Sequence, residues 1–178
     1  MNLPNKLTIL RVLMIPVFLF VLMSGAGGVY SRYIATAIFV LASATDALDG
    51  HIARKYNLIT NFGKFMDPMA DKLLVCSALI ALIETRDIPS IAVIIIIARE
   101  FIISGFRLIA SDNGVVIAAS KWGKLKTISQ MVMIIYLLLG LGGTISMMLD
   151  FVMIWVPVVL TIISAVDYII KNLNVLKS

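Results

Sequence analysis

Apolar residues run along this 178-residue chain in stretches too long for the interior of a soluble domain. The stretches approach the ~20 residues that an α-helix needs to cross about 30 Å of hydrocarbon. They do not alternate with polar residues as exposed strands do, and a bilayer admits only helices or closed barrels, so the pattern predicts helices. We expect six transmembrane helices, at Leu7–Ser24, Tyr33–Leu48, Met66–Ile83, Ile88–Ile109, Leu125–Leu141 and Ser146–Ile170.

Short connections separate the apolar stretches, and they carry glycine or charge at Gly25–Gly28, Glu84–Asp87 and Gly142–Gly143. Pro16 and Pro157 fall inside stretches, where proline is expected to bend a helix without ending it. The composition is 61% hydrophobic, well above the roughly 45–50% of soluble domains. The sequence therefore predicts an all-α, polytopic membrane protein, folded as one domain over residues 1–178.

The basic residues are distributed unevenly over this topology. If the spans alternate in direction, most of them fall on one side, and only Arg32 and Arg86 lie opposite. The positive-inside rule assigns the basic side, and with it both termini, to the cytoplasm. This signal and attraction to anionic lipid head groups account for the net charge of +5, so we expect membrane lipids and not nucleic acid as partners.

Four aspartates flank the connection between the second and third stretches. Asp46 and Asp49 project within about 60° of each other on one helix face, and Asp67 and Asp71 within about 40° on the next. A reversal between residues 56 and 61 would bring the two pairs face to face. A carboxylate at membrane depth costs at least ~2.5–3.5 kcal/mol, so cations must offset four of them. Oxygen ligands without Cys or His favour two hard divalent ions, Mg²⁺ or Mn²⁺.

Structural interpretations of these aspartates remain open. Asp67 precedes Pro68 and could be the N-cap of a helix, and Asp49–Gly50 could be a helix end. Surface ion pairs are a further alternative, with Arg54, Lys55, Lys64 and Lys72 as partners. A metal site explains all four spacings together, which the separate structural interpretations do not.

The pattern Asp46-x-x-Asp49-Gly50-x-x-Ala53-Arg54, followed after eight residues by Gly63-x-x-x-Asp67-x-x-x-Asp71, resembles the signature of the CDP-alcohol phosphatidyltransferase family. The resemblance implies a homodimer of six-helix subunits that transfers a phosphatidyl group from CDP-diacylglycerol to an alcohol and releases CMP. It implies that the four aspartates bind two metal ions, with Asp71 also acting as general base. By the same resemblance, Gly50 and Ala53 leave space for the nucleotide, Arg54 contacts its phosphates and Gly63 permits close helix packing.

Cationic residues farther along the chain bear on the identity of the alcohol. Arg99 and Arg107 interrupt the fourth span, and Lys121, Lys124 and Lys126 begin the fifth. Guanidinium and ammonium groups bind phosphate well. Alternatively, the lysines anchor a helix at the head groups, and Arg99 pairs with Glu100 or Asp112.

Three stretches resemble the phosphatidylglycerophosphate synthase branch of the family: Asn2–Thr8 with Arg11, Arg99-Glu100-Phe101 with Arg107, and Gly123-Lys124-Leu125-Lys126-Thr127. That branch uses sn-glycerol 3-phosphate as the acceptor. The resemblance implies phosphate contacts from Arg99, Arg107, Lys124 and Lys126. We expect a multi-pass enzyme of the bacterial inner membrane, and the positive-inside rule places its active site on the cytoplasmic side.

Other functions remain open at this point. The same chemistry could serve serine, inositol phosphate or phosphatidylglycerol as the acceptor. A divalent-cation transporter could use the same aspartates. It would also need acidic residues along a path to the other side of the membrane. Apart from the loop residues Glu84 and Asp87, Asp150 is the one candidate there. The hypothesis of a structural membrane subunit does not explain why four aspartates occur at these spacings.

Overall fold

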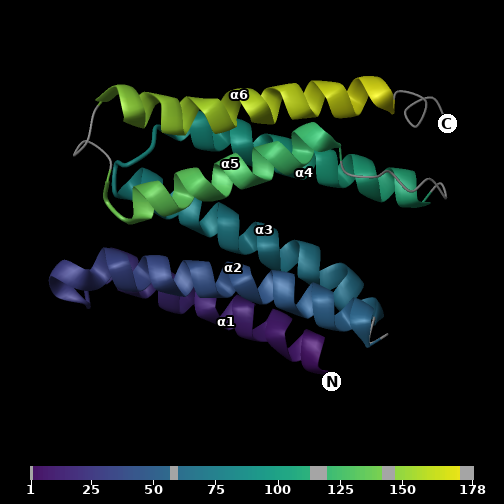
Figure 1. Cartoon of the computed structure of the whole chain (residues 1–178), viewed down its shortest axis with the longest axis horizontal. Coiled ribbons are helices and arrows are strands. Elements are labelled where there is room, and N and C mark those ends of the chain that lie inside the picture. Colours follow the sequence, from purple (N-terminus) through teal and green to yellow (C-terminus); the bar gives the residue numbers. More distant parts are fainter. Residues whose placement is uncertain (1, 57–59, 113–119, 142–146, 173–178) are drawn as a thin grey trace. The chain divides into compact units, whose positions relative to one another are not determined.

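The computed structural model describes residues 2–56, 60–112, 120–141 and 147–172. This part of the chain is helical (Figure 1), with α1 (Leu3–Ser24), a 3-10 turn η1 (Gly28–Tyr30), α2 (Ser31–Lys55), α3 (Asn61–Glu84), α4 (Ser90–Asp112), α5 (Lys121–Leu138) and α6 (Met147–Lys171). Each predicted stretch corresponds to one α-helix, so the all-α prediction is confirmed. The predicted connection at Gly142–Gly143 lies outside the described residues.

Two of the described helices, α1 and α6, are long and apolar enough to cross a bilayer. Pro16 and Pro157 lie inside these two helices and end neither of them. The remaining α-helices carry more charge along their length, including the aspartates of α2 and α3. Six membrane spans therefore stay a prediction.

The chain forms two compact units. The N-terminal unit comprises Met1–Arg86 and Leu138–Gly140, and the C-terminal unit comprises Asp87–Leu137 and Leu141–Ser178. In the N-terminal unit α1 packs along both α2 and α3. The Phe18 and Phe39 rings meet between α1 and α2 with their centroids 5.9 Å apart. Because α1 contacts both neighbours, its polar residues can reach side chains on either.

Helix α3 begins well before the aspartates that it carries. Its N-cap is Thr60, whose side-chain oxygen accepts from the Gly63 N–H at 3.0 Å and donates to Oδ1 of Asn5 on α1 at 2.9 Å. Pro68 consequently lies inside α3, and Asp67 does not cap it. Helix α2 likewise continues past Gly50 to Lys55. Both helix-end interpretations of the aspartates are therefore wrong.

In the C-terminal unit α4 packs against α6. The Phe106 and Tyr168 rings meet edge to face with centroids 5.7 Å apart, and Ile103 joins them in one buried cluster. Helix α5 approaches α6 at Gly123, where an added Cβ would lie 3.7 Å from Oγ of Ser164. The small residue thus allows α5 to come close to polar groups of α4 and α6.

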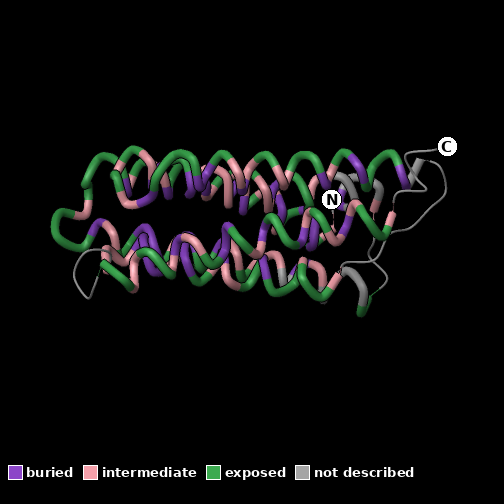
Figure 2. The backbone as a smooth tube through the Cα atoms, turned by 90° about the horizontal axis from the view of Figure 1, so that it is seen from above, coloured by how far each residue is buried: buried purple, intermediate pink, exposed green. Residues whose placement is uncertain are grey.

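Exposed apolar side chains and buried polar side chains occur together on α1. Large apolar side chains on α1, such as Leu13 and Phe20, are 60% and 64% exposed, whereas Thr8 and Arg11 are fully buried. Figure 2 shows buried and exposed positions recurring along the helices. An apolar exterior around polar contacts suits a surface that faces hydrocarbon.

The cap of α3 yields a stability prediction. Thr60→Ala removes both hydrogen bonds of the hydroxyl and should lower the free energy of unfolding by about 1–2 kcal/mol. Thr60→Ser keeps both bonds and should lose little. The measurement is thermal unfolding of the purified protein in detergent. Equal melting temperatures for the alanine variant and the unaltered protein would contradict this role of Thr60.

Candidate functional site

Helix α1 carries a polar stripe of Asn5, Thr8 and Arg11. Residues three apart lie on neighbouring positions of one helix face. All three are buried, at 7%, 0% and 0% exposure. Because α1 packs along both α2 and α3, this stripe lies where the aspartates of those helices can meet it.

Arg11 joins the two aspartates of α2. Its Nη1 lies 2.8 Å from Oδ1 of Asp46, and its Nη2 lies 2.5 Å from Oδ2 of Asp49. Its Nε donates to Oγ1 of Thr45 at 3.3 Å. Asp49 is almost as buried as Arg11, at 2% side-chain exposure, whereas Asp46 is 44% exposed. Every nitrogen of the guanidinium group therefore has a partner on α2.

The stripe also reaches α3. Thr8 donates from Oγ1 to Oδ1 of Asp67 at 2.5 Å. At Gly63, an added Cβ would lie 3.2 Å from Oδ1 of Asn5 and 3.4 Å from Oδ2 of Asp67. A side chain at this position would crowd the stripe, so the glycine lets α3 approach α1 beside the carboxylate.

The structure thus gathers carboxylates from two helices around α1. Asp49 lies close enough to Asp46 and Asp67 for their charges to interact. Asp71 follows Asp67 by one turn of α3 and is partly buried. Arg11 supplies one positive charge to this group, and the carboxylates offer oxygen atoms of the type that Mg²⁺ and Mn²⁺ prefer.

No group of three or more His, Cys, Asp and Glu side chains within the described ranges is arranged to hold a metal ion. Asp46 and Asp49 instead pair with Arg11, and Asp67 accepts from Thr8. The donor chemistry fits hard cations, but their binding stays a prediction.

The predicted nucleotide contacts are described only in part. Gly50 is partly buried on α2, in the turn that follows Asp46. Ala53 and Arg54 belong to the backbone of α2, but their side chains lie outside the described part of the chain. Their predicted roles therefore remain untested.

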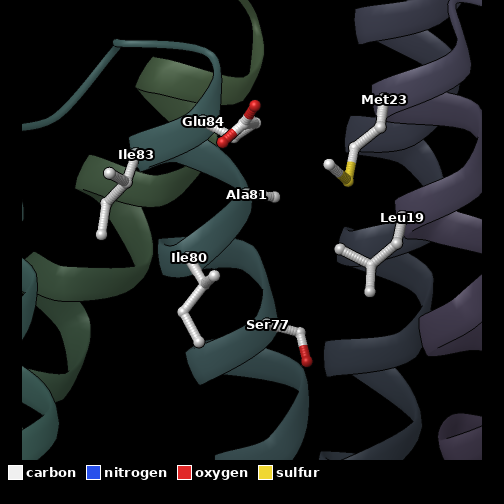
Figure 3. Close-up of a pocket in the computed structure, with 7 residues that line it drawn as sticks. All are labelled: Leu19, Met23, Ser77, Ile80, Ala81, Ile83 and Glu84. Atoms are coloured by element: carbon white, nitrogen blue, oxygen red, sulfur yellow. The ribbon is translucent and has the colours of Figure 1, made fainter.

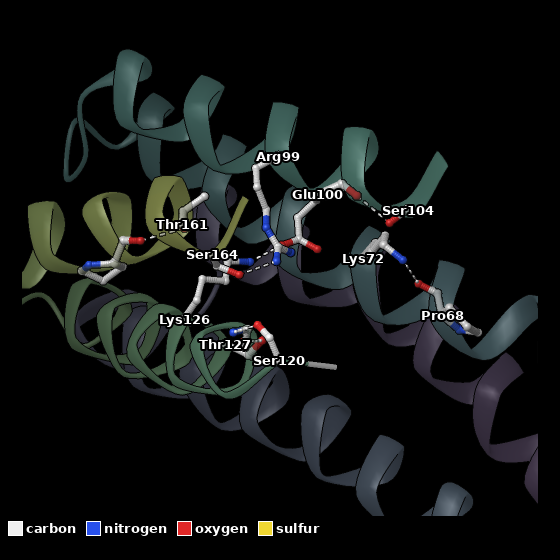
Figure 4. A network of polar contacts seen from close by, with 12 residues as sticks. Pro68, Lys72, Arg99, Glu100, Ser104, Ser120, Lys126, Thr127, Thr161 and Ser164 are labelled. Carbon is white, nitrogen blue, oxygen red and sulfur yellow. Dashed lines mark hydrogen bonds and ion pairs between the residues drawn. The ribbon is translucent and has the colours of Figure 1, made fainter. Parts of the chain in front are cut away.

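A second polar group lies in the C-terminal unit, between α4, α5 and α6 (Figure 4). Glu100 Oε1 pairs with Nη1 of Arg99 at 3.3 Å and with Nζ of Lys126. Arg99 also donates from Nη2 to Oγ of Ser164 on α6 at 2.7 Å. The side chains of Arg99, Glu100 and Lys126 are 14%, 17% and 4% exposed. The predicted pairing of Arg99 with Glu100 is confirmed, and Lys126 shares the same carboxylate.

The four predicted phosphate contacts do not all meet. Arg99 and Lys126 converge on Glu100, whereas Lys124 is exposed on α5. Lys124 and Lys126 are two positions apart, which corresponds to a rotation of about 200° around the helix axis, so their side chains point to different sides. Arg107 is exposed on α4, and its positive charge interacts electrostatically with the Tyr168 hydroxyl on α6.

A pocket of about 380 Å³ in the N-terminal unit is separate from the aspartates (Figure 3). Its lining comes from Leu19 and Met23 of α1 and from α3 between Ser77 and Glu84. Leu19 follows Thr8 by eleven residues, or about 16 Å along the helix. The lining is mainly apolar, so this pocket does not offer the carboxylate chemistry of the site.

Two kinds of site residue were not predicted from the sequence. Arg11 entered the predictions through the topology and the family resemblance, without a role at the aspartates, although its spacing from Asn5 and Thr8 is a signal for a shared face. Ser164 and Tyr168 lie in an apolar helix where nothing nearby in the sequence indicates a polar partner. Their positions depend on the packing of α6 against α4.

Comparisons with known proteins agree with these observations. The profile of a family described as CDP-alcohol phosphatidyltransferase matches residues 1–163. A Bacillus subtilis protein named CDP-diacylglycerol–glycerol-3-phosphate 3-phosphatidyltransferase is 41% identical, over 99% of this chain and 98% of its own length. A Rickettsia typhi protein of the same name is 43% identical over 94% of each chain. A Mycobacterium tuberculosis protein named probable phosphatidylglycerophosphate synthase is 44% identical over 97% of this chain and 82% of its own.

The buried pairing of Arg11 gives a second stability prediction. Arg11→Met leaves Asp49 buried without a counter-charge and should cost about 3–5 kcal/mol of unfolding free energy with divalent ions chelated. Adding Asp49→Asn should recover part of that loss, because the uncompensated charge is then gone. Lys6→Met, at an exposed position of the same helix, is the matched control and should change stability by less than about 0.5 kcal/mol.

The measurement is denaturation in detergent micelles with a chelator present. If Arg11→Met were as stable as Lys6→Met, the ion pairs of Arg11 would not hold α1 against α2.

Proposed function

Since the chain belongs to the CDP-alcohol phosphatidyltransferase family, and is therefore a phosphotransferase, we propose that it transfers the phosphatidyl group of CDP-diacylglycerol to sn-glycerol 3-phosphate. The products are phosphatidylglycerophosphate and CMP. The observation that carries the choice of acceptor is similarity over nearly the whole chain to relatives whose names contain this acceptor. The buried cationic pair Arg99 and Lys126 supports it, because such groups bind a phosphomonoester well.

We further propose that Asp46, Asp49, Asp67 and Asp71 hold two divalent ions, Mg²⁺ or Mn²⁺. Bound there, the ions would neutralise the diphosphate of CDP-diacylglycerol and stabilise CMP as it leaves. The convergence of oxygen ligands from α2 and α3 supports this assignment. Arg11 adds a fixed positive charge to the same group, which favours an anionic substrate.

In the proposed reaction, a hydroxyl oxygen of glycerol 3-phosphate attacks the phosphorus of the phosphatidyl group. A new oxygen–phosphorus bond forms as the bond to CMP breaks. Asp71 accepts the proton of the attacking hydroxyl. A carboxylate is a weak base toward an alcohol, so the proton transfers as the new bond forms and not before.

Residues of the chain position the two substrates in this proposal. Gly50 and Ala53 make room for the nucleotide, Arg54 contacts its phosphates, and Gly63 keeps α3 close to α1. In the C-terminal unit, Arg99 and Lys126 bind the acceptor phosphate. Arg107 and Lys124 are exposed and contribute long-range attraction, which raises the rate of encounter with an anion.

We propose that the enzyme is a six-span homodimer of the bacterial inner membrane, with both termini and the site on the cytoplasmic side. The apolar helices α1 and α6 support membrane insertion, and the relatives are bacterial. The family profile extends over both compact units, which supports one functional domain. Acceptors such as serine, inositol phosphate or phosphatidylglycerol are the competing assignment. The family match disfavours a divalent-cation transporter.

An acceptor panel tests the proposed reaction. The purified protein, supplied with CDP-diacylglycerol and Mg²⁺ or Mn²⁺, should release CMP with glycerol 3-phosphate and at most slowly with serine, inositol phosphate or phosphatidylglycerol. A chelator should stop the release, and adding back either ion should restore it. Faster CMP release with another acceptor would reject glycerol 3-phosphate, and full activity in excess chelator would reject the metal ions.

The proposed base gives a separate prediction. Asp71→Asn keeps the size of the side chain but removes its ability to accept a proton, so turnover should fall at least 10²-fold. Glu84→Gln makes the same chemical change at an exposed position of α3 and should leave turnover unchanged. CMP release is measured for both variants, together with their melting temperatures. A near-normal rate in a folded Asp71→Asn enzyme would exclude Asp71 as the base.

A further inference from the structure

Two hydrogen-bond donors in the C-terminal unit are buried without partners among the described residues. They are Nε of Arg99 and the hydroxyl of Tyr168. Arg99 uses its other two nitrogens, on Glu100 and Ser164. A buried polar group that makes no hydrogen bond lowers stability by about as much as one or two good bonds add. Such groups therefore call for an explanation, and a ligand is one.

Tyr168 is held firmly in place although its hydroxyl has no partner. The residue is 5% exposed, and its ring packs edge to face on Phe106 of α4 and against Ile103. It follows Ser164 by one turn of α6, on the face that Arg99 contacts through the Ser164 hydroxyl. Packing thus fixes the ring, and no hydrogen bond within the described residues is needed for this.

The electrostatic surroundings of Tyr168 are positive. Arg99 and Arg107 both act on its hydroxyl, and both belong to α4. Glu100 faces Arg99 and Lys126 and already accepts from both. Asp167, next to Tyr168 on α6, pairs with Lys171. A ligand that satisfies the remaining donors must therefore offer acceptor oxygens, and the adjacent arginines favour a negative charge on it.

We propose that the Tyr168 hydroxyl and Nε of Arg99 together bind the phosphate of the acceptor, so that Tyr168 is a substrate-binding residue on α6. The assignment rests on the proposed function for the identity of the acceptor. In the ligand-free protein, Glu100 offsets one of the two positive charges of Arg99 and Lys126 and holds both side chains. The acceptor phosphate then satisfies the two donors that Glu100 and Ser164 do not reach.

Tyr168→Phe tests this role with the smallest change available. The variant loses only the hydroxyl, so KM for glycerol 3-phosphate should rise about tenfold or more, whereas KM for CDP-diacylglycerol and kcat should stay within about twofold. Because the hydroxyl has no partner in the empty site, the ligand-free variant should be at least as stable as the unaltered protein.

Tyr136→Phe is the matched control in the same unit. The Tyr136 hydroxyl donates to Oδ1 of Asp150 at 2.6 Å, so its loss should lower the melting temperature without changing KM for glycerol 3-phosphate. A Tyr168→Phe variant that was destabilised like Tyr136→Phe would show that the Tyr168 hydroxyl has a structural partner, and this would overturn the proposal.

Thermal stabilisation by added ligand separates this proposal from the proposed function. Glycerol 3-phosphate and inorganic phosphate should each stabilise the unaltered protein, and Tyr168→Phe should respond only at about tenfold higher concentration. Equal responses of the two proteins would overturn the role of Tyr168 even if the enzyme uses glycerol 3-phosphate. If no CMP were released with glycerol 3-phosphate, a Tyr168-dependent response to inorganic phosphate would still establish the anion site, while the proposed acceptor would fall.

Discussion

The N-terminal unit depends on one interaction, the buried contact of Arg11 with Asp46 and Asp49. The guanidinium group is fully buried and holds both carboxylates of α2, so α1 and α2 cannot separate without exposing unpaired charge to an apolar setting. Apolar residues of similar size would often stabilise such a position better. Stability alone therefore does not explain an arginine and two aspartates at these positions, whereas a functional requirement does. This agrees with the membership of the chain in a phosphotransferase family.

The C-terminal unit follows the same rule with the charges reversed. Here one carboxylate, Glu100, serves two cations, Arg99 and Lys126, and Ser164 takes a further donor. In the ion pairs around Arg11 two carboxylates share one cation, whereas in those around Glu100 two cations share one carboxylate. Each group thus has an excess of the charge opposite to its expected ligand, which is a cation for the aspartates and a phosphate for Arg99 and Lys126. The built-in counter-ion keeps the excess small enough for the helices to pack.

The helices could be predicted from the sequence because hydrophobic runs of this length leave few alternatives. Their charged ends agree with the reversal expected between residues 56 and 61, since α2 continues to Lys55 and α3 begins at Asn61. The hydrogen bond of the Thr60 cap to Asn5 on α1 could not be predicted, because the two residues lie far apart in the chain. The aspartate edges were predicted from helical spacing, which is local. The partner of Asp46 and Asp49 was not, because Arg11 lies more than thirty residues away in the chain. The same spacing rule separates Lys124 from Lys126, and the unlike environments of these two lysines were therefore predictable.

Exposure divides the carboxylates of α2 into two kinds. Asp46 is 44% exposed and keeps part of its hydration, whereas Asp49 is 2% exposed and depends on Arg11 for compensation. If all four aspartates were ionised, their charge would exceed the one positive charge of Arg11 by three. Two divalent ions would bring four charges and reverse that balance, leaving the group with a net positive charge of one. A site with a net positive charge attracts a diphosphate. The metal ions held by the carboxylates would therefore also bind the anionic substrate.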